Sequence, residues 1–416
     1  MKRNIILLAI LITNILNAQS YKYAHYCLDS LTSKNFSGRA YQNLGDKKAK
    51  NFIKNELIKN NISDIKEQEF DISINNIKDV KLKLYSKDSA YLKAGEDYMV
   101  YGYSPSTNLI ITKEKPIRLK NIFSKRLDYK NYNNKVILLD YKTDEKTKIY
   151  SFLGKLNRFG ISPKLVIIQN GGKMQYPMGT RKNPFPVIEL KDEINKKKID
   201  YLELSIVSEY NEKYTTQNLW AKIEGTQKKD SFFVFISHYD HLGMINDSCY
   251  FPGANDNASG VSVSMDLAKY YSNNPSPYSI VFIFSSAEEI GLIGSNFAAE
   301  NPFIDLSKVK FLFNLDMCGT GSQGIALING EKEKRASDLM KEINDEELYF
   351  NEIRIGGESC NSDHCPFVEK DVPSLFLFTF GCEYNEYHTI YDNGKGLSFT
   401  KHLDFCNILK EFIKRY

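Results

Sequence analysis

The chain has 416 residues, with 55 Lys and Arg against 51 Asp and Glu, so its formal net charge is only +4. The charges are interspersed, whereas a dedicated nucleic-acid-binding protein usually carries a basic domain or stripe, so we expect no nucleic-acid partner. A hydrophobic content of 42% excludes a disordered chain, and the length predicts two or three domains.

Residues 1–18 have the pattern of a signal peptide. Lys2 and Arg3 form a positively charged start, and Ile5–Ile12 form an apolar run that is too short to span a bilayer. Cleavage is expected after Ala18, and a buried N-terminal helix is the alternative. We expect no stable membrane insertion after removal of this segment, and an exported protein, either periplasmic or secreted.

The next segments predict a helix, then strands, then an insert. Ala49, Ile53 and Leu57 follow helical spacing, and from about residue 71 to 111 apolar and polar residues alternate as in strands. Three short apolar runs separated by turn-rich stretches then indicate a compact, β-rich insert over residues 105–216. The runs are Val136–Leu139, Leu165–Ile168 and Pro186–Leu190.

From Asn218 onward, apolar runs alternate with helical stretches such as Gly260–Tyr271. This alternation predicts an α/β fold with a mostly parallel, doubly wound sheet and helices on both faces. Residues 19–104 and 217–416 are expected to form this domain together, on either side of the insert. The apolar runs are Phe232–Ile236, Ile280–Phe284, Val309–Leu315 and Leu375–Phe380.

Each of these four runs is followed by an acid or a histidine. A doubly wound sheet places its functional groups at the carboxyl ends of its strands, so we expect these side chains to meet at one edge. One more acid lies in the Gly- and Asn-rich loop 253–260, before a helix. The residues are His238, Asp240, Asp256, Glu288, Glu289, Asp316 and His388.

Two imidazoles with three or four carboxylates suit zinc, or less selectively manganese or cobalt. More than four such ligands suggest two metal ions about 3.5–4 Å apart, sharing a carboxylate and a water or hydroxide. Adjacent Glu288 and Glu289 can then divide the work, one binding metal and the other accepting a proton. Taken singly, paired glutamates are often a solvated helix face and Asp256 could cap a helix, but the whole set is hard to explain without metal.

Five motifs in chain order resemble the secreted two-zinc aminopeptidases, a family that also includes glutamate carboxypeptidase II-like enzymes and glutaminyl cyclases. An N-terminal stretch that ends at Arg39 also fits this resemblance, and the insert resembles a protease-associated domain. The motifs are Ser-His-Tyr-Asp (237–240), the loop 253–260, Ala-Glu-Glu-Ile-Gly-Leu-Ile-Gly-Ser (287–295), Asn-Leu-Asp-Met-Cys-Gly (314–319) and Tyr-His-Thr-Ile-Tyr-Asp (387–392).

The resemblance implies two zinc ions and a ligand for each position. Asp256 would be the bridging carboxylate. His238 and Asp316 would complete one zinc site, and Glu289 and His388 the other.

The resemblance also implies roles for residues that do not bind metal. Glu288 would be the general base, Asp240 the acid that orients His238, and Tyr387 a candidate donor to the oxyanion. The pair Asp363 and His364 is expected near the substrate pocket. Other histidines are expected to be a polar neighbour of the site (His241) or structural or surface residues (His25 and His402).

The implied function is a metal-dependent exopeptidase acting on peptide substrates, an aminopeptidase in which a two-zinc-bridged hydroxide attacks the scissile carbonyl. A two-zinc carboxypeptidase or deacylase is the alternative, but the 26 residues between Glu289 and Asp316 leave no room for the lid domain of that group. Glutaminyl cyclisation needs a single metal, and a non-catalytic binding module would have lost ligands. Of the seven cysteines, Cys360 and Cys365 are the pair we expect to form a disulfide. The side-chain preference, the recognition of a free N-terminal amine or of a C-terminal carboxylate, the native metal and the oligomeric state stay open.

Overall fold

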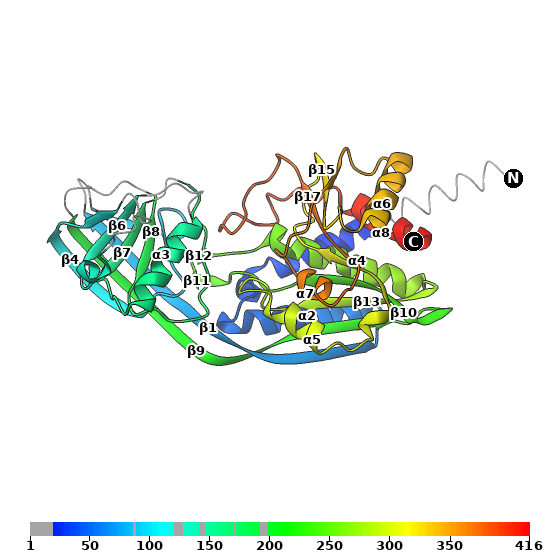
Figure 1. The fold of residues 1–416 in the computed structure, drawn as a ribbon, viewed down its shortest axis with the longest axis horizontal. Helices are drawn as coiled ribbons and strands as arrows, with labels where there is room; N and C mark the ends of the chain where they lie inside the picture. Colours follow the sequence, from blue (N-terminus) through cyan, green and yellow to red (C-terminus); the bar gives the residue numbers. More distant parts are fainter. Residues whose placement is uncertain (1–19, 86–88, 120–127, 141–145, 170–171, 192–198) are drawn as a thin grey trace.

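The computed structural model describes residues 20–85, 89–119, 128–140, 146–169, 172–191 and 199–416. Figure 1 shows a smaller body and a larger body side by side, joined by two long strands that run along both. These strands are β1 (Asp64–Tyr85) and β9 (Ile199–Ile223), and they pair antiparallel along nearly their whole length. The predicted signal peptide, 1–18, lies outside the described residues.

The larger body is built on a sheet whose central strands run parallel, as predicted. In the described part of the chain the order is β16-β15-β17-β14-β10-β13-β9-β1-β2, with β4 also paired to β9. The parallel centre places the carboxyl ends of four strands at one edge. These four strands are β10 (Lys228–His238), β13 (Tyr278–Ser285), β14 (Val309–Leu315) and β17 (Ser374–Phe380). The other strands of the sheet, besides β1 and β9, are β15 (Gly324–Ile328), β16 (Ile353–Ile355), β2 (Ser89–Leu92) and β4 (Thr107–Glu114).

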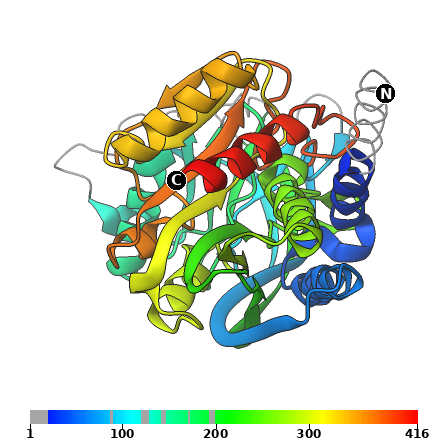
Figure 2. The same ribbon diagram turned by 90° about the vertical axis from the view of Figure 1, so that its right-hand side faces the viewer.

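Helices cover both faces of this sheet because successive strand residues point to opposite sides. Phe233 and Phe235 pack into one core cluster, and Val234 and Ile236 pack into another. Each fully buried side chain of this size stabilises the fold by about 1.5–3 kcal/mol. One face is covered by residues 20–31, α2 (Gly45–Lys59), α4 (Gly260–Asn273), α6 (Lys334–Glu347) and α8 (His402–Arg415). Figure 2 shows α4, α6 and α8 lying together on this face. The other face is covered by α5 (Ile293–Glu300) and α7 (Cys365–Val368).

The smaller body has its own sheet, in the order β3-β8-β7-β6-β5. The three apolar runs predicted for the insert are strands of this sheet, and its parallel part is flanked by α3 (Lys146–Arg158). The sheet also takes in Tyr98–Val100, which precedes residue 105, and residue 216 falls inside β9, so the division at 105 and 216 stays a prediction. The strands are β3 (Tyr98–Val100), β5 (Ile117–Leu119), β6 (Val136–Asp140), β7 (Leu165–Gln169) and β8 (Val187–Leu190).

Short elements complete the described chain, and several of them lie near strand ends. The pairing of β1 with β9 is irregular between Ile72 and Ile74 and between Ile77 and Asp79, where the ribbon passes from one body to the other. The elements are η1 (Lys34–Arg39), η2 (Gln42–Leu44), η3 (Tyr129–Tyr132), β11 (Met244–Asn246), β12 (Cys249–Tyr250), η5 (Ala254–Ser259) and η6 (Leu306–Lys308).

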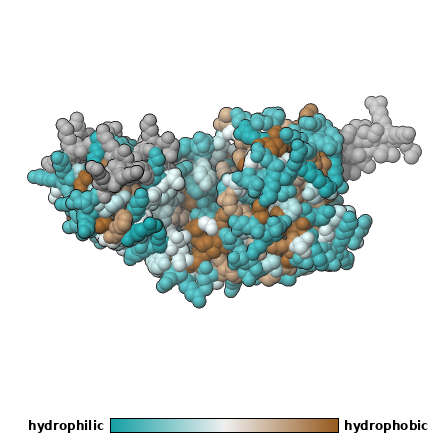
Figure 3. Space-filling view, in the orientation of Figure 1, coloured by the Kyte–Doolittle hydropathy of each residue, from teal (hydrophilic) through white to brown (hydrophobic). Residues whose placement is uncertain are grey.

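Cys360 and Cys365 form a disulfide, which confirms the predicted pair. Figure 3 shows a largely hydrophilic surface with scattered hydrophobic patches, one of them near the junction of the two bodies. Within the described residues, no helix combines the length and the apolar character needed to cross a membrane.

Candidate metal centre

The carboxyl ends of β10 and β14 bring the first group of predicted ligands together. His238 is the last residue of β10, and Asp316 follows β14, its parallel neighbour in the sheet. His238 Nε2 lies 3.3 Å from Asp316 Oδ1 and 3.3 Å from Asp256 Oδ1. All three side chains are almost completely buried.

A second group shares the same aspartate. His388 Nε2 lies 3.0 Å from Glu289 Oε2 and 3.1 Å from Asp256 Oδ2. The two oxygens of Asp256 therefore face different histidines. The structure thus brings together all five residues that the sequence predicted as ligands.

A buried arginine holds the loop that carries Asp256. Arg39 is fully buried, and its guanidinium donates to the carbonyl oxygens of Pro252 (2.6 Å), Gly253 (2.8 Å) and Asp256 (3.3 Å). It also donates to the carbonyl oxygens of Tyr239 at 2.8 Å and Leu31 at 3.1 Å. One side chain thereby fixes the loop, the end of β10 and the N-terminal helix relative to one another.

Asp392 holds the same loop from the other side. Its carboxylate accepts the backbone N–H of Asn255 at 2.8 Å and that of Asp256 at 3.1 Å. The loop also approaches β14 so closely that a Cβ atom on Gly260 would lie 2.2 Å from the carbonyl oxygen of Leu315. Only glycine permits this approach, which sets Asp256 beside Asp316.

Glu288 and Asp240 flank the His238 side. Ligand atoms of Glu288, His238 and Asp316 lie within 4.8 Å of one another, and Glu288 is half-buried. The Asp240 carboxylate accepts the Glu288 backbone N–H at 3.2 Å. His238 Nδ1 lies 3.2 Å from the main-chain carbonyl oxygen of Asp240 and 3.8 Å from its carboxylate, so the closer contact to the histidine comes from the backbone.

His241 contacts one of the predicted ligands. Its Nδ1 lies 2.6 Å from Glu289 Oε1 and 4.0 Å from Asp256 Oδ2, and the side chain is fully buried. This contact agrees with the expectation that His241 is a polar neighbour of the site. The available signal was its position three residues after His238, in the same strand-end loop.

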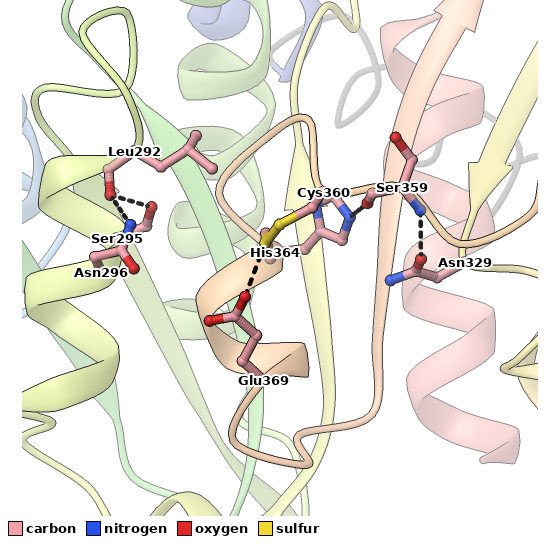
Figure 4. The surroundings of a disulfide bond; sticks show 9 residues. Leu292, Ser295, Asn296, Asn329, Ser359, Cys360, His364 and Glu369 are labelled. Atoms are coloured by element: carbon pink, nitrogen blue, oxygen red, sulfur yellow. Dashed lines mark hydrogen bonds between the residues drawn. A yellow bond between two sulfur atoms is a disulfide. The ribbon is translucent and has the colours of Figure 1, made fainter.

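The loop after β16 supports Asp316. Ser362 Oγ donates to Asp316 Oδ2 at 2.7 Å and accepts from Asn314 Nδ2 at 2.7 Å. Asp363, also fully buried, accepts from Ser285. Figure 4 shows the disulfide of this loop beside His364, whose Nε2 lies 2.7 Å from the carbonyl oxygen of Ser359.

The remaining predicted residues lie in two places. The Tyr387 ring stacks on the His388 ring, with centroids 3.8 Å apart and planes at 17°, and 44% of Tyr387 is exposed. His402, in contrast, is buried between α4 and α8, where its Nε2 lies 3.0 Å from Asp266 Oδ2.

The carboxylates dominate the electrostatics of the site. Burial opposes protonation of His238, yet Asp316 and Glu288 raise its pKa well above the usual value. In the same way Glu289 and Asp256 outweigh burial and raise the pKa of His388 to about 10. Although burial acts in the opposite direction, His238 and His388 hold the pKa of Asp256 well below its usual value.

A site that draws protons onto one buried and one partly exposed imidazole has a strongly negative potential, which a divalent cation can neutralise instead. Imidazole nitrogen with carboxylate oxygen is the donor set that zinc takes in catalytic sites. The residues present therefore fit zinc.

Comparison with known proteins finds a peptidase family over the larger body, in agreement with the resemblance seen in the sequence. Residues 218–412 match Peptidase family M28. Aminopeptidase YwaD of Bacillus subtilis (strain 168) is 29% identical over 250 residues, which cover 56% of this chain and 53% of that protein. The match therefore spans about half the length of that relative. Leucine aminopeptidase 2 of Trichophyton equinum is 26% identical over 369 residues, 82% of this chain and 68% of the relative.

Solved structures share the fold of both bodies. BSAP, a zinc aminopeptidase from Bacillus subtilis, has a TM-score of 0.72 at 22% identity, over 94% of this chain and 93% of that one. A Peptidase M28 precursor from Shewanella amazonensis SB2B has a TM-score of 0.72 at 19% identity, over 97% and 95%. The family match covers the strand ends that carry the predicted ligands, so over residues 218–412 the chain is similar to Peptidase family M28.

Proposed function

We propose that this chain is an exported, zinc-dependent aminopeptidase that removes N-terminal residues from peptides, with two zinc ions at the site. The observation that carries the proposal is the placement of Asp256, whose two carboxylate oxygens lie 3.3 Å from His238 Nε2 and 3.1 Å from His388 Nε2. A carboxylate placed in this way can be shared by two ions. His238 and Asp316 would hold one ion, and Glu289 and His388 the other.

Bound zinc would polarise the scissile carbonyl and lower the pKa of a water molecule. Glu288 would accept a proton from that water and pass it to the nitrogen of the leaving amine as the C–N bond breaks. Asp240 would hold Glu288 in place through the backbone N–H that it accepts at 3.2 Å. Tyr387, stacked on His388, would donate to the oxyanion.

Two further points support an aminopeptidase. Relatives that match this chain are named aminopeptidases, and their likeness extends beyond the site residues. Between Glu289 and Asp316 the chain forms only α5, η6 and β14, so a carboxypeptidase-type lid domain has no place there.

We further propose that the smaller body is a protease-associated-like domain beside the substrate cleft.

The experiment is hydrolysis of a panel of aminoacyl chromogenic substrates, with N-blocked peptides and an N-terminal glutamine peptide as comparison. Each is assayed with chelator, without it, and after zinc is restored. Chelator-sensitive release from free-amine substrates supports the proposal. Activity confined to blocked or C-terminal substrates would favour the carboxypeptidase alternative, and cyclisation of the glutamine peptide would favour a cyclase.

A further inference from the structure

A segment of the smaller body lies against the loop that carries His388. This positioning segment, residues 173–178, follows β7 in the connection to β8. The Tyr176 backbone N–H donates to the His388 carbonyl oxygen at 3.4 Å, and Gln175 Nε2 donates to the Tyr387 carbonyl oxygen at 3.2 Å. Lys173 forms an ion pair with Glu386 at 2.7 Å and also donates to the Asn385 carbonyl oxygen.

The positioning segment is itself firmly anchored. Tyr176 is only 2% exposed, and its ring stacks on Phe251, with centroids 5.3 Å apart and planes at 20°. Phe251 follows β12 and lies two residues before the loop 253–260, so this stack joins the positioning segment to the chain that leads into that loop. Just after the segment, the Gly179 carbonyl oxygen accepts the Asn75 backbone N–H at 2.7 Å, which ties it to β1.

The loop that receives these contacts needs support. His388 adopts φ 58°, a left-handed conformation that is unfavourable for a residue with a Cβ atom. After His388, the loop is held through Asp392. The Asp392 carboxylate accepts from Tyr384 Oη at 2.9 Å and from the backbone N–H groups of the loop that carries Asp256. The positioning segment supports the same loop at residues 385–388, through the contacts described above.

We propose that the positioning segment, with Tyr176 as its central positioning residue, holds His388 in ligand geometry, so that metal binding beside Glu289 depends on the smaller body. This inference rests on the proposed function in that it takes His388 as a zinc ligand. Residues that support a metal ligand typically change metal affinity by about 10–100-fold when they are replaced.

The test compares three full-length variants by zinc titration against a competing chelator, without substrate. Tyr176→Ala removes the stacked ring and should lower the affinity for one of the two zinc ions about tenfold or more. Tyr176→Phe keeps the ring and should restore wild-type affinity. Phe152→Ala is the matched control, because Phe152, a residue of α3, is 1% exposed in the core of the smaller body and belongs to a different cluster from Tyr176.

Phe152→Ala should lower thermal stability and leave zinc affinity unchanged. Equal zinc affinity in Tyr176→Ala and wild type would overturn the proposal, and so would equal losses in Tyr176→Ala and Phe152→Ala. If Tyr176→Ala does not fold, the double variant Lys173→Ala, Gln175→Ala changes one exposed and one half-buried side chain and should still lower the zinc affinity about threefold. No change there would likewise count against the inference.

These outcomes are separable from the fate of the proposed function. A wild-type protein that binds zinc but hydrolyses no peptide contradicts the aminopeptidase proposal and leaves the zinc titrations of the variants meaningful. Unaltered zinc binding in the variants contradicts the positioning role alone.

Discussion

At the scale of single residues, the site depends on how each carboxylate divides its contacts among its neighbours. Asp256 faces two histidines, one with each oxygen, while Asp240 accepts from the backbone of Glu288. Glu289 is contacted by two imidazoles, those of His388 at 3.0 Å and His241 at 2.6 Å. Glu288, in contrast, lies within reach of a shared metal ion only with His238 and Asp316. This difference in surroundings is consistent with the different tasks that we propose for the two adjacent glutamates.

Replacing Glu288 with Gln should separate metal binding from turnover. The amide keeps the shape of the side chain but cannot accept the proton, and a general base contributes about 10²–10⁴ to the rate. We expect kcat to fall by that factor while zinc content stays at the wild-type level. Steady-state kinetics with metal analysis of the same sample checks both, and near-normal turnover would contradict the assigned role.

Replacing Asp256 with Asn should affect both metal positions at once. The neutral amide removes the charge that the two histidines share, whereas His388→Ala removes a ligand from one position only. We expect Asp256→Asn to lose most bound zinc after gel filtration and His388→Ala to retain the ion beside His238. Metal analysis of the eluted protein measures this, and similar zinc retention in the two variants would argue against a shared carboxylate.

The predicted ligands could be found from the sequence because each follows an apolar run or lies in a glycine-rich loop. The supporting residues could not be found in the same way. Arg39 contacts the 252–256 loop across more than 200 residues, and Asp392 contacts it across more than 130. Local patterns carry no information about such contacts, so the resemblance named these stretches without explaining them. The roles of all these residues stay predictions until tested.

At the scale of elements, the loop 253–260 is the part that the rest of the fold constrains most. Arg39 enters it from the N-terminal segment, Asp392 from the C-terminal segment, and Gly260 lets it touch β14. The strands of the central sheet and α2 and α4 were predictable from apolar periodicity. The extent of β1 and β9 was not, because their outer faces are largely polar and alternate only in part.

Replacing Arg39 with Met should destabilise the fold as well as the site. The apolar side chain leaves several buried carbonyl oxygens without a donor, and each unsatisfied group costs about 1–3 kcal/mol. We expect the free energy of unfolding to fall by at least about 3 kcal/mol, measured by urea denaturation, with weaker zinc binding.

The matched control for Arg39 is Arg354→Met. Arg354 is exposed and pairs with Glu352 at 3.1 Å, and an exposed pair of this kind contributes about 1 kcal/mol or less. A loss in Arg39→Met no larger than in this control would show that the buried guanidinium is dispensable.

At the scale of the whole molecule, we expect zinc binding to be coupled to folding. The five predicted ligands come from segments that span residues 238 to 388, and they meet only in the folded chain. A ligand that binds the native state alone stabilises it by about 2.7 kcal/mol for each site at 100 times its Kd.

Removing zinc with a chelator should therefore lower the melting temperature by several degrees. Restoring zinc should recover it, whereas magnesium should not, since magnesium prefers all-oxygen octahedral sites. Differential scanning calorimetry of one preparation before chelation, after it and after each metal is added provides the measurement. An unchanged melting temperature would mean that the cluster holds no tightly bound ion.

The β1–β9 ribbon has a consequence for protein engineering. The two strands cross from one body to the other as a paired ladder with two irregular positions, so the smaller body cannot be exchanged as a cassette cut at two loops. A graft from a relative must join inside paired strands and keep the residue count of both on each side of the irregular positions near 72–79. A slip of one residue would turn the inward side chains of the ribbon outward. Chimeras with matched pairing should thus be recovered as soluble protein, and those shifted by a single residue should not.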